Sequence, residues 1–130
     1  MRKIILLVLL TCASMQFVSA QTSTTKNNTP MLRHVVLFKF SDKTTPADVK
    51  KIEEAFRGLP GKIDLIKDFE WGVNNSPEKL NQGLTHCFFV TFSSAKDRDD
   101  YLVHPAHKDF VAIAGSSIEK VTVVDYWVHK

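Results

Sequence analysis

The feature that most constrains this chain is a set of short segments that alternate like β-strands yet carry apolar side chains on both faces. In residues 33–40, one phase holds His34, Val36, Phe38 and Phe40, and the other holds Val35, Leu37 and Lys39. Residues 85–92 and 118–128 repeat this pattern. Because exposed apolar surface costs about 25 cal/mol per Å², both faces of the resulting sheet need cover.

Helical patterns separate these strands and set the order of the elements. Thr45 is a typical helix cap and precedes Pro46, and apolar residues then recur at helical spacing until Gly58 and Pro60 end the helix. The later elements are a strand over 66–73, a strand over 85–92, a helix from Ser94 that Pro105 interrupts, and a last strand over 118–128. This order predicts an α+β, ferredoxin-like β-α-β-β-α-β fold.

Two helical segments can cover only one face of a four-stranded sheet. We expect a second copy of the chain to cover the other face, so that two sheets pack face to face in a dimeric α/β barrel. The alternative is a monomer in which the N-terminal leader or the connection of residues 74–83 folds over the sheet, but both segments are polar. The sequence therefore predicts a homodimer.

The N-terminus has the pattern of an export signal. Residues 1–20 combine Arg2 and Lys3, a short apolar run and a small-residue exit, which predicts a signal peptide cleaved near Ala20. Residues 21–30 read as a flexible leader and residues 31–130 as one folded domain. We expect a periplasmic or secreted protein; a retained membrane anchor and a lipid anchor at Cys12 remain as alternatives.

Charge and cysteine content exclude several classes of partner. Residues 1–20 hold two of the 17 basic residues and none of the 14 acidic ones, so the processed chain has a formal charge of +1. Without a basic cluster, neither nucleic acid nor a membrane is an expected partner. Cys87 would be the one thiol left after cleavage, so an internal disulfide is excluded and stability must come from the core.

Residues 101–107 (YLVHPAH) place Tyr101, His104 and His107 around a proline turn. Asp125 lies between apolar neighbours in the last strand and needs a partner, for which a histidine is the obvious choice. Such a pair leaves the other ring nitrogen as a base, while Tyr101 can donate to a developing oxyanion. The plainer alternative is that an aspartate–histidine pair only ties the last strand to the second helix.

Other sites are less well supported by the sequence. His104 and His107 have metal-ligand spacing, but Pro105 should break the turn between them, so we expect no metal site. The chain has no glycine-rich phosphate loop and no Gly-x-Ser-x-Gly motif, and we expect no cofactor. His34 and His86 share the phase of the apolar residues in their strands and are candidates for ligand contact.

Five segments together resemble the stress-responsive A/B barrel (Dabb) family: residues 34–40 (HVVLFKF), 69–72 (FEWG), 83–86 (GLTH), 101–107 (YLVHPAH) and 124–126 (VDY). The resemblance implies a dimeric α+β barrel. It also implies a mixed set of functions, because the family includes stress-associated plant proteins that form stable oligomers and a plant polyketide cyclase that performs an aldol-type ring closure.

Carried over by position, the pocket histidine of that cyclase matches His34, its catalytic tyrosine and histidine match Tyr101 and His107, and the aspartate beside that histidine matches Asp125. The chain departs from it at Phe56, where the cyclase has a tyrosine. We therefore expect a small, partly apolar ligand between sheet and helices, contacted by His34, Phe56, His86 and His104, with Tyr101, His107 and Asp125 as candidate catalytic residues. The sequence leaves two alternatives to simple ligand binding: an enzyme that converts this ligand, and an oligomer in which the same residues only hold the fold.

Overall fold

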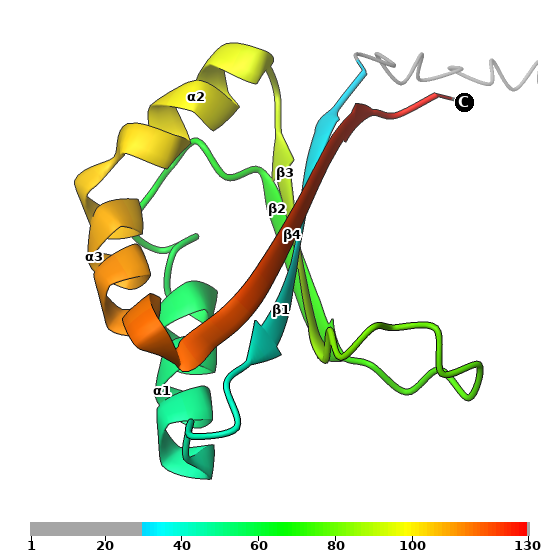
Figure 1. Cartoon of the computed structure of the whole chain (residues 1–130). Coiled ribbons are helices and arrows are strands. Elements are labelled where there is room, and N and C mark those ends of the chain that lie inside the picture. Colours follow the sequence, from blue (N-terminus) through cyan, green and yellow to red (C-terminus); the bar gives the residue numbers. More distant parts are fainter. Residues whose placement is uncertain (1–29, 130) are drawn as a thin grey trace, which may run out of the picture.

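The computed structural model describes residues 30–129, in which a four-stranded antiparallel sheet carries all its α-helices on one face (Figure 1). The elements are β1 (Leu32–Phe40), α1 (Pro46–Arg57), β2 (Asp68–Val73), β3 (His86–Phe92), α2 (Ala95–Val103), α3 (Pro105–Ala114), the short 3-10 helix η1 (Gly115–Ser117) and β4 (Ile118–Trp127). The strand order is β2-β3-β1-β4. The ferredoxin-like prediction is confirmed.

Local side-chain caps fix where the helices begin. The Thr45 hydroxyl accepts a hydrogen bond from the Asp48 backbone N–H at 3.2 Å, and Ser94 accepts one from Asp97 at 3.0 Å. His104 ends α2 and caps α3, because its Nδ1 accepts from the Ala106 backbone N–H at 3.1 Å. Pro105 then occupies the first turn of α3, so the interruption expected there is confirmed.

The second strand of the structure is shorter than the strand expected over residues 66–73. Ile66 lies in a turn, where its N–H donates to the Ile63 carbonyl at 3.1 Å, and β2 begins at Asp68. The turn directs Ile63 into the core, where it is 1% exposed. Burial of that side chain outweighs the strand preference of the next residues.

Aromatic side chains dominate the core between the helices and the sheet. Phe56 of α1 stacks on Phe88 of β3 with ring centroids 4.1 Å apart, and it contacts Phe110 of α3 at 4.7 Å. Phe38 of β1 lies 5.3 Å from Phe88. These contacts join both helical segments to the two central strands, so the helix-facing side of the sheet is fixed by a single aromatic cluster.

The opposite face of the sheet is apolar and uncovered. Val124 and Tyr126 of the edge strand β4 are 50% and 44% exposed, and the Tyr126 ring lies 6.5 Å from the half-buried Phe89. The connection of residues 74–85 projects from one end of the sheet, away from the helices, and Leu80 within it is 75% exposed (Figure 1). The connection therefore leaves Val124 and Tyr126 exposed, while it shares a pocket with Lys120 and Thr122 near the start of β4.

The predicted signal peptide (residues 1–20) and residues 21–29 of the predicted leader lie outside the described residues. Between residues 30 and 129, no helix has both the length and the apolar character required to cross a membrane.

Candidate functional site

A cavity of about 560 Å³ lies between the sheet and the α2–α3 corner. Its lining comes from β1, α1, α2, α3, η1 and β4 and consists of His34, Val36, Phe38, Phe56, Tyr101, Leu102, His107, Phe110, Val111, Ala114, Gly115, Ile118, Val121, Val123 and Asp125. The cavity opens along β4, where Val121 and Val123 are 55% and 50% exposed. Most of the wall is apolar, and the polar groups gather at one end.

Strand register brings the polar residues of β1 and β4 together. In the antiparallel β1–β4 pair, His34 lies directly opposite Asp125, and Val36 lies opposite Val123. Residues directly opposite each other project from the same face of a sheet, and the phase of Val36 and Val123 is the helix-facing one. Asp125 therefore lies beside His34 within the cavity, although apolar residues surround both of them in sequence.

The α2–α3 corner contributes Tyr101 and His107. Tyr101 is fully buried, and its ring lies 4.5 Å from the His107 ring and 5.9 Å from the His34 ring. His107 Nδ1 lies 3.1 Å from the Leu102 carbonyl oxygen. A carbonyl only accepts, so Nδ1 carries the hydrogen and Nε2 of the neutral ring is a free acceptor.

Burial adjusts the protonation of both groups. Burial lowers the pKa of His107 below its ordinary value, which outweighs the opposing effect of the Leu102 hydrogen bond. Burial raises the pKa of Tyr101 far above its ordinary value. At neutral pH the corner therefore presents a neutral imidazole as proton acceptor and a phenol as hydrogen-bond donor.

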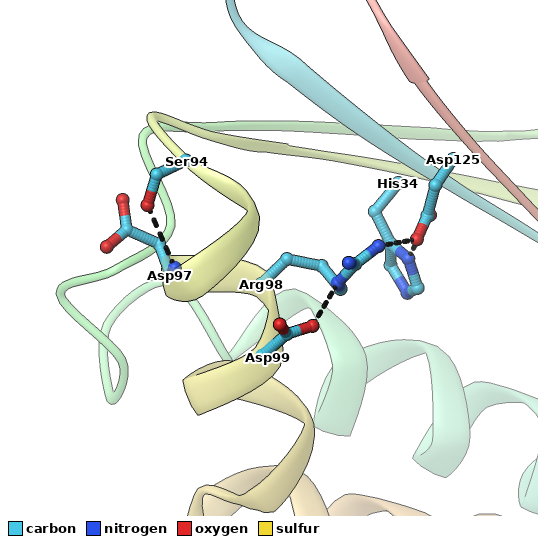
Figure 2. Close-up of polar contacts among 6 residues, drawn as sticks. All are labelled: His34, Ser94, Asp97, Arg98, Asp99 and Asp125. Atoms are coloured by element: carbon cyan, nitrogen blue, oxygen red, sulfur yellow. Dashed lines mark hydrogen bonds and ion pairs between the residues drawn. The ribbon is translucent and has the colours of Figure 1, made fainter.

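Asp125 forms a second polar contact that links the sheet to α2. His34 Nδ1 lies 2.6 Å from Asp125 Oδ1, and Arg98 of α2 donates to Asp125 Oδ2 (Figure 2). The Asp125 side chain is 26% exposed, whereas that of His34 is 5% exposed. The predicted histidine partner of Asp125 is thus His34 on β1, and the tie to the second helix comes from Arg98.

This arrangement corrects one expectation and adds a residue that the sequence patterns did not indicate. The resemblance placed Asp125 beside His107, whereas its carboxylate binds His34. Arg98 was not singled out in the sequence, since no motif joins it to a residue 27 positions later. The available signal was its spacing: Arg98 lies three residues before Tyr101, on the same side of α2.

Two of the candidate ligand contacts lie elsewhere. His86 Nε2 lies 3.0 Å from Glu53 Oε1, and the His86 ring packs edge-on against Phe40 at 4.9 Å. His104 serves as the cap of α3. Neither side chain lines the cavity, whereas the other five predicted site residues do: His34, Phe56, Tyr101, His107 and Asp125.

Metal and thiol chemistry find little support in the described part of the chain. Among residues 30–129, no three His, Cys, Asp or Glu side chains come together as a metal site. Cys87 is half-buried, and burial raises the pKa of its thiol, which disfavours the reactive thiolate.

Comparison with known proteins places this chain in a family. The chain is 38% identical over 95 residues to the stress-response A/B barrel domain-containing protein HS1 of Arabidopsis thaliana, which covers 73% of this chain and 87% of that protein. It is 32% identical over 99 residues to olivetolic acid cyclase of Cannabis sativa, covering 76% and 98% of the two chains.

A solved structure agrees with this placement. A dimeric protein of unknown function with a ferredoxin-like fold, from Bacteroides fragilis, superposes with a TM-score of 0.61 at 28% identity, covering 74% of this chain and 94% of that one. The family described as Stress responsive A/B Barrel Domain matches residues 32–128, nearly the whole of the described structure. The chain therefore belongs to the stress-responsive A/B barrel domain (Dabb) family.

Proposed function

We propose that this chain binds a small, partly apolar molecule in the cavity between the sheet and the α2–α3 corner. The observation that carries the proposal is a cavity of about 560 Å³ with an apolar wall and one polar end. Ligand pockets typically occupy about 300–1,000 Å³ and combine an apolar lining with a few convergent polar groups. His107 lines this cavity, and the cavity volume falls within that range, although the cavity is open along β4.

The polar end defines what the ligand carries. The Tyr101 hydroxyl suits a carbonyl or another acceptor, because its raised pKa keeps it protonated. The free Nε2 of His107 suits a hydroxyl or enol donor. A hydrocarbon or aromatic body with a neighbouring carbonyl and hydroxyl at one end satisfies both groups and leaves its apolar part against Phe38, Phe110 and Val111.

Acid–base catalysis of a cyclase or lyase type is a second candidate function. A histidine Nε2 would take a proton from carbon or oxygen, and Tyr101 would donate to the oxyanion that develops. The site residues that line the cavity and the 32% identity to a protein named olivetolic acid cyclase favour this candidate. Phe56 offers no hydroxyl, so a different substrate is expected. A non-catalytic, stress-protective oligomer is the competing function.

Homodimerisation and export complete the proposal. The uncovered apolar face that includes Val124 and Tyr126 supports a homodimer, as does the likeness to a protein described as dimeric. Two sheets packed through this face would remove those side chains from water. The apolar run after Lys3 and the small residues before Gln21 support export to the periplasm or medium after cleavage near Ala20.

A matched pair of variants tests the cavity. Val123 and Val124 are equally exposed, at 50%, but project from opposite faces of β4. Val123→Trp should fill the mouth of the cavity and abolish binding of ortho-hydroxyacetophenone, followed by protein-observed NMR, whereas Val124→Trp should leave the affinity of each cavity unchanged. Ethylbenzene, which lacks both polar groups, is the control probe and should bind more weakly.

Two outcomes would overturn ligand binding at this site. One is equal binding of ortho-hydroxyacetophenone by wild type and Val123→Trp. The other is no detectable binding of either probe, together with no small molecule released when the purified protein is denatured and examined by mass spectrometry. Turnover is tested separately, by following the chemical change of any molecule that co-purifies.

A further inference from the structure

Arg98 reaches the cavity's polar end from the first turn of α2. The Ser94 cap fixes the start of this helix, and the Arg98 side chain extends from it toward the sheet (Figure 2). Arg98 Nε contacts Asp99 Oδ1 at 2.7 Å, and its terminal Nη1 contacts Asp125 Oδ2. The Asp99 side chain is 64% exposed and that of Asp125 is 26% exposed, so the Asp125 contact is the better shielded of the two.

The two oxygens of Asp125 have different partners. Oδ1 faces His34 Nδ1 at 2.6 Å, and Oδ2 receives the Arg98 guanidinium. A carboxylate bound to a guanidinium is ionised and only accepts hydrogen bonds. His34 Nδ1 must therefore donate, so whenever the ring is neutral its Nε2 is the nitrogen without a hydrogen.

We propose that Arg98 is a positioning residue: by holding Asp125 from the helix side, it fixes His34 in the Nδ1–H form and makes His34 Nε2 a second proton acceptor in the cavity. This inference rests on the proposed function of the cavity. It refines the expected ligand, because acceptors on both His34 and His107 beside the Tyr101 donor suit a molecule with two hydroxyl or enol groups and one carbonyl.

A positioning role for Arg98 differs from a purely structural contact between α2 and β4, because it determines which nitrogen of His34 carries the hydrogen. A tie between α2 and β4 needs only the ion pair between Arg98 and Asp125. Control of the tautomer also needs the Asp125 carboxylate to stay in the orientation that faces His34. With 26% of its side chain exposed, Asp125 has room to turn toward water once Arg98 no longer holds it.

The test measures the His34 ring in the full chain without any ligand. Long-range ¹H–¹⁵N NMR distinguishes the nitrogen that carries hydrogen from the one that does not. Wild type should show His34 with hydrogen on Nδ1. Arg98→Ala should lower the ratio of the Nδ1–H to the Nε2–H form by about fivefold, the scale of one ordinary hydrogen bond. Arg98→Lys should restore most of this ratio because it retains the cation.

Two variants serve as controls on the same helix. Lys96→Ala removes the exposed Lys96–Asp100 pair, and Asp99→Asn removes the negative charge of the other partner of Arg98; neither touches Asp125. Both should leave the His34 tautomer ratio as in wild type. The unfolding midpoint of each variant, measured in urea, shows whether a change in the ring reflects loss of the fold.

The proposal is overturned if wild-type His34 carries its hydrogen on Nε2, or if folded Arg98→Ala has the wild-type ratio. If Arg98→Ala does not fold, Arg98→Lys decides. The lysine ammonium would hold the Asp125 carboxylate through a single, longer contact, so the Nδ1 hydrogen of His34 should exchange faster with water than in wild type. An unchanged exchange rate would contradict the positioning role. If wild type bound neither probe and released no small molecule on denaturation, the proposed function would be overturned, while this measurement would remain interpretable.

Discussion

His34 Nδ1 lies 2.6 Å from Asp125 Oδ1, although the two residues are 91 positions apart in the chain. The contact follows from the register of β1 and β4, in which these residues are direct partners. It places a buried imidazole and a carboxylate at the polar end of an otherwise apolar cavity. The same register places Val36 opposite Val123, so one strand pairing supplies both the polar end and part of the apolar wall.

Replacing Tyr101 by phenylalanine should separate its packing from its hydroxyl. The ring fills a buried position and would stay, so the free energy of unfolding should change by no more than about 1 kcal/mol. Loss of the donor should weaken binding of ortho-hydroxyacetophenone by about tenfold, while leaving ethylbenzene unaffected. Urea unfolding and NMR titration measure the two effects; equal loss for both probes would mean that the hydroxyl does not contact the ligand.

His107 should make stability depend on pH. Burial lowers its pKa in the folded protein, so between that lower value and the unfolded value of about 6.5 the unfolded chain binds more protons. Stability should therefore fall as the pH drops below about 7, and His107→Gln should reduce the fall. Chemical unfolding at a series of pH values measures it.

His129→Gln, at an exposed position after β4, is the matched control for this series. It should leave the slope of stability against pH unchanged. If His107→Gln and His129→Gln gave the same slope as wild type, the burial of His107 would have no part in the pH dependence.

Phe56 should be the most costly single side chain to truncate. It is 1% exposed and contacts Phe88, Phe110 and Phe69 at once. Phe56→Ala should lower the free energy of unfolding by about 3–5 kcal/mol, because it leaves a cavity between α1 and the sheet. Phe56→Leu keeps most of the volume and should cost less; equal losses in urea unfolding would contradict the packing explanation.

A lysine on the uncovered sheet face should break the proposed homodimer. Val124→Lys places a charge on the face that we expect to be buried between two copies, so sedimentation at micromolar concentration should shift from dimer to monomer. Val103→Lys adds the same charge at the end of α2, where the valine is 62% exposed, and should remain dimeric. A folded wild-type monomer under the same conditions would refute the dimer.

Gly115 should resist substitution because of its backbone and not for lack of space. Its φ of +36° lies where side chains with a Cβ are strained, yet a Cβ there would meet no atom within 4 Å. Gly115→Ala should therefore cost about 1–3 kcal/mol, measured by thermal unfolding. Gly72→Ala is the control, since it has the same open space without a positive φ.

The sequence predicted the elements because each carries its own local signal. The caps at Thr45 and Ser94, the break at Pro105 and the alternation around Val36 act over a few residues, and the structure retains all of them. Local sequence patterns indicated four residues that line the cavity, His34, Tyr101, His107 and Asp125, and the resemblance to the Dabb family added Phe56. The alternation of apolar side chains on both faces of the strands is visible without any tertiary contact.

Only the tertiary structure decided which polar groups meet. Asp125 needed a partner, but strand register selected His34, and the packing of α2 added Arg98. His86 has the same apolar phase as His34, yet the antiparallel pairing of β1 and β3 places it opposite Phe38, where it binds Glu53. Phase along a strand is a local property, whereas the partner of a buried charge depends on register and helix docking, which arise from contacts between residues far apart in the chain.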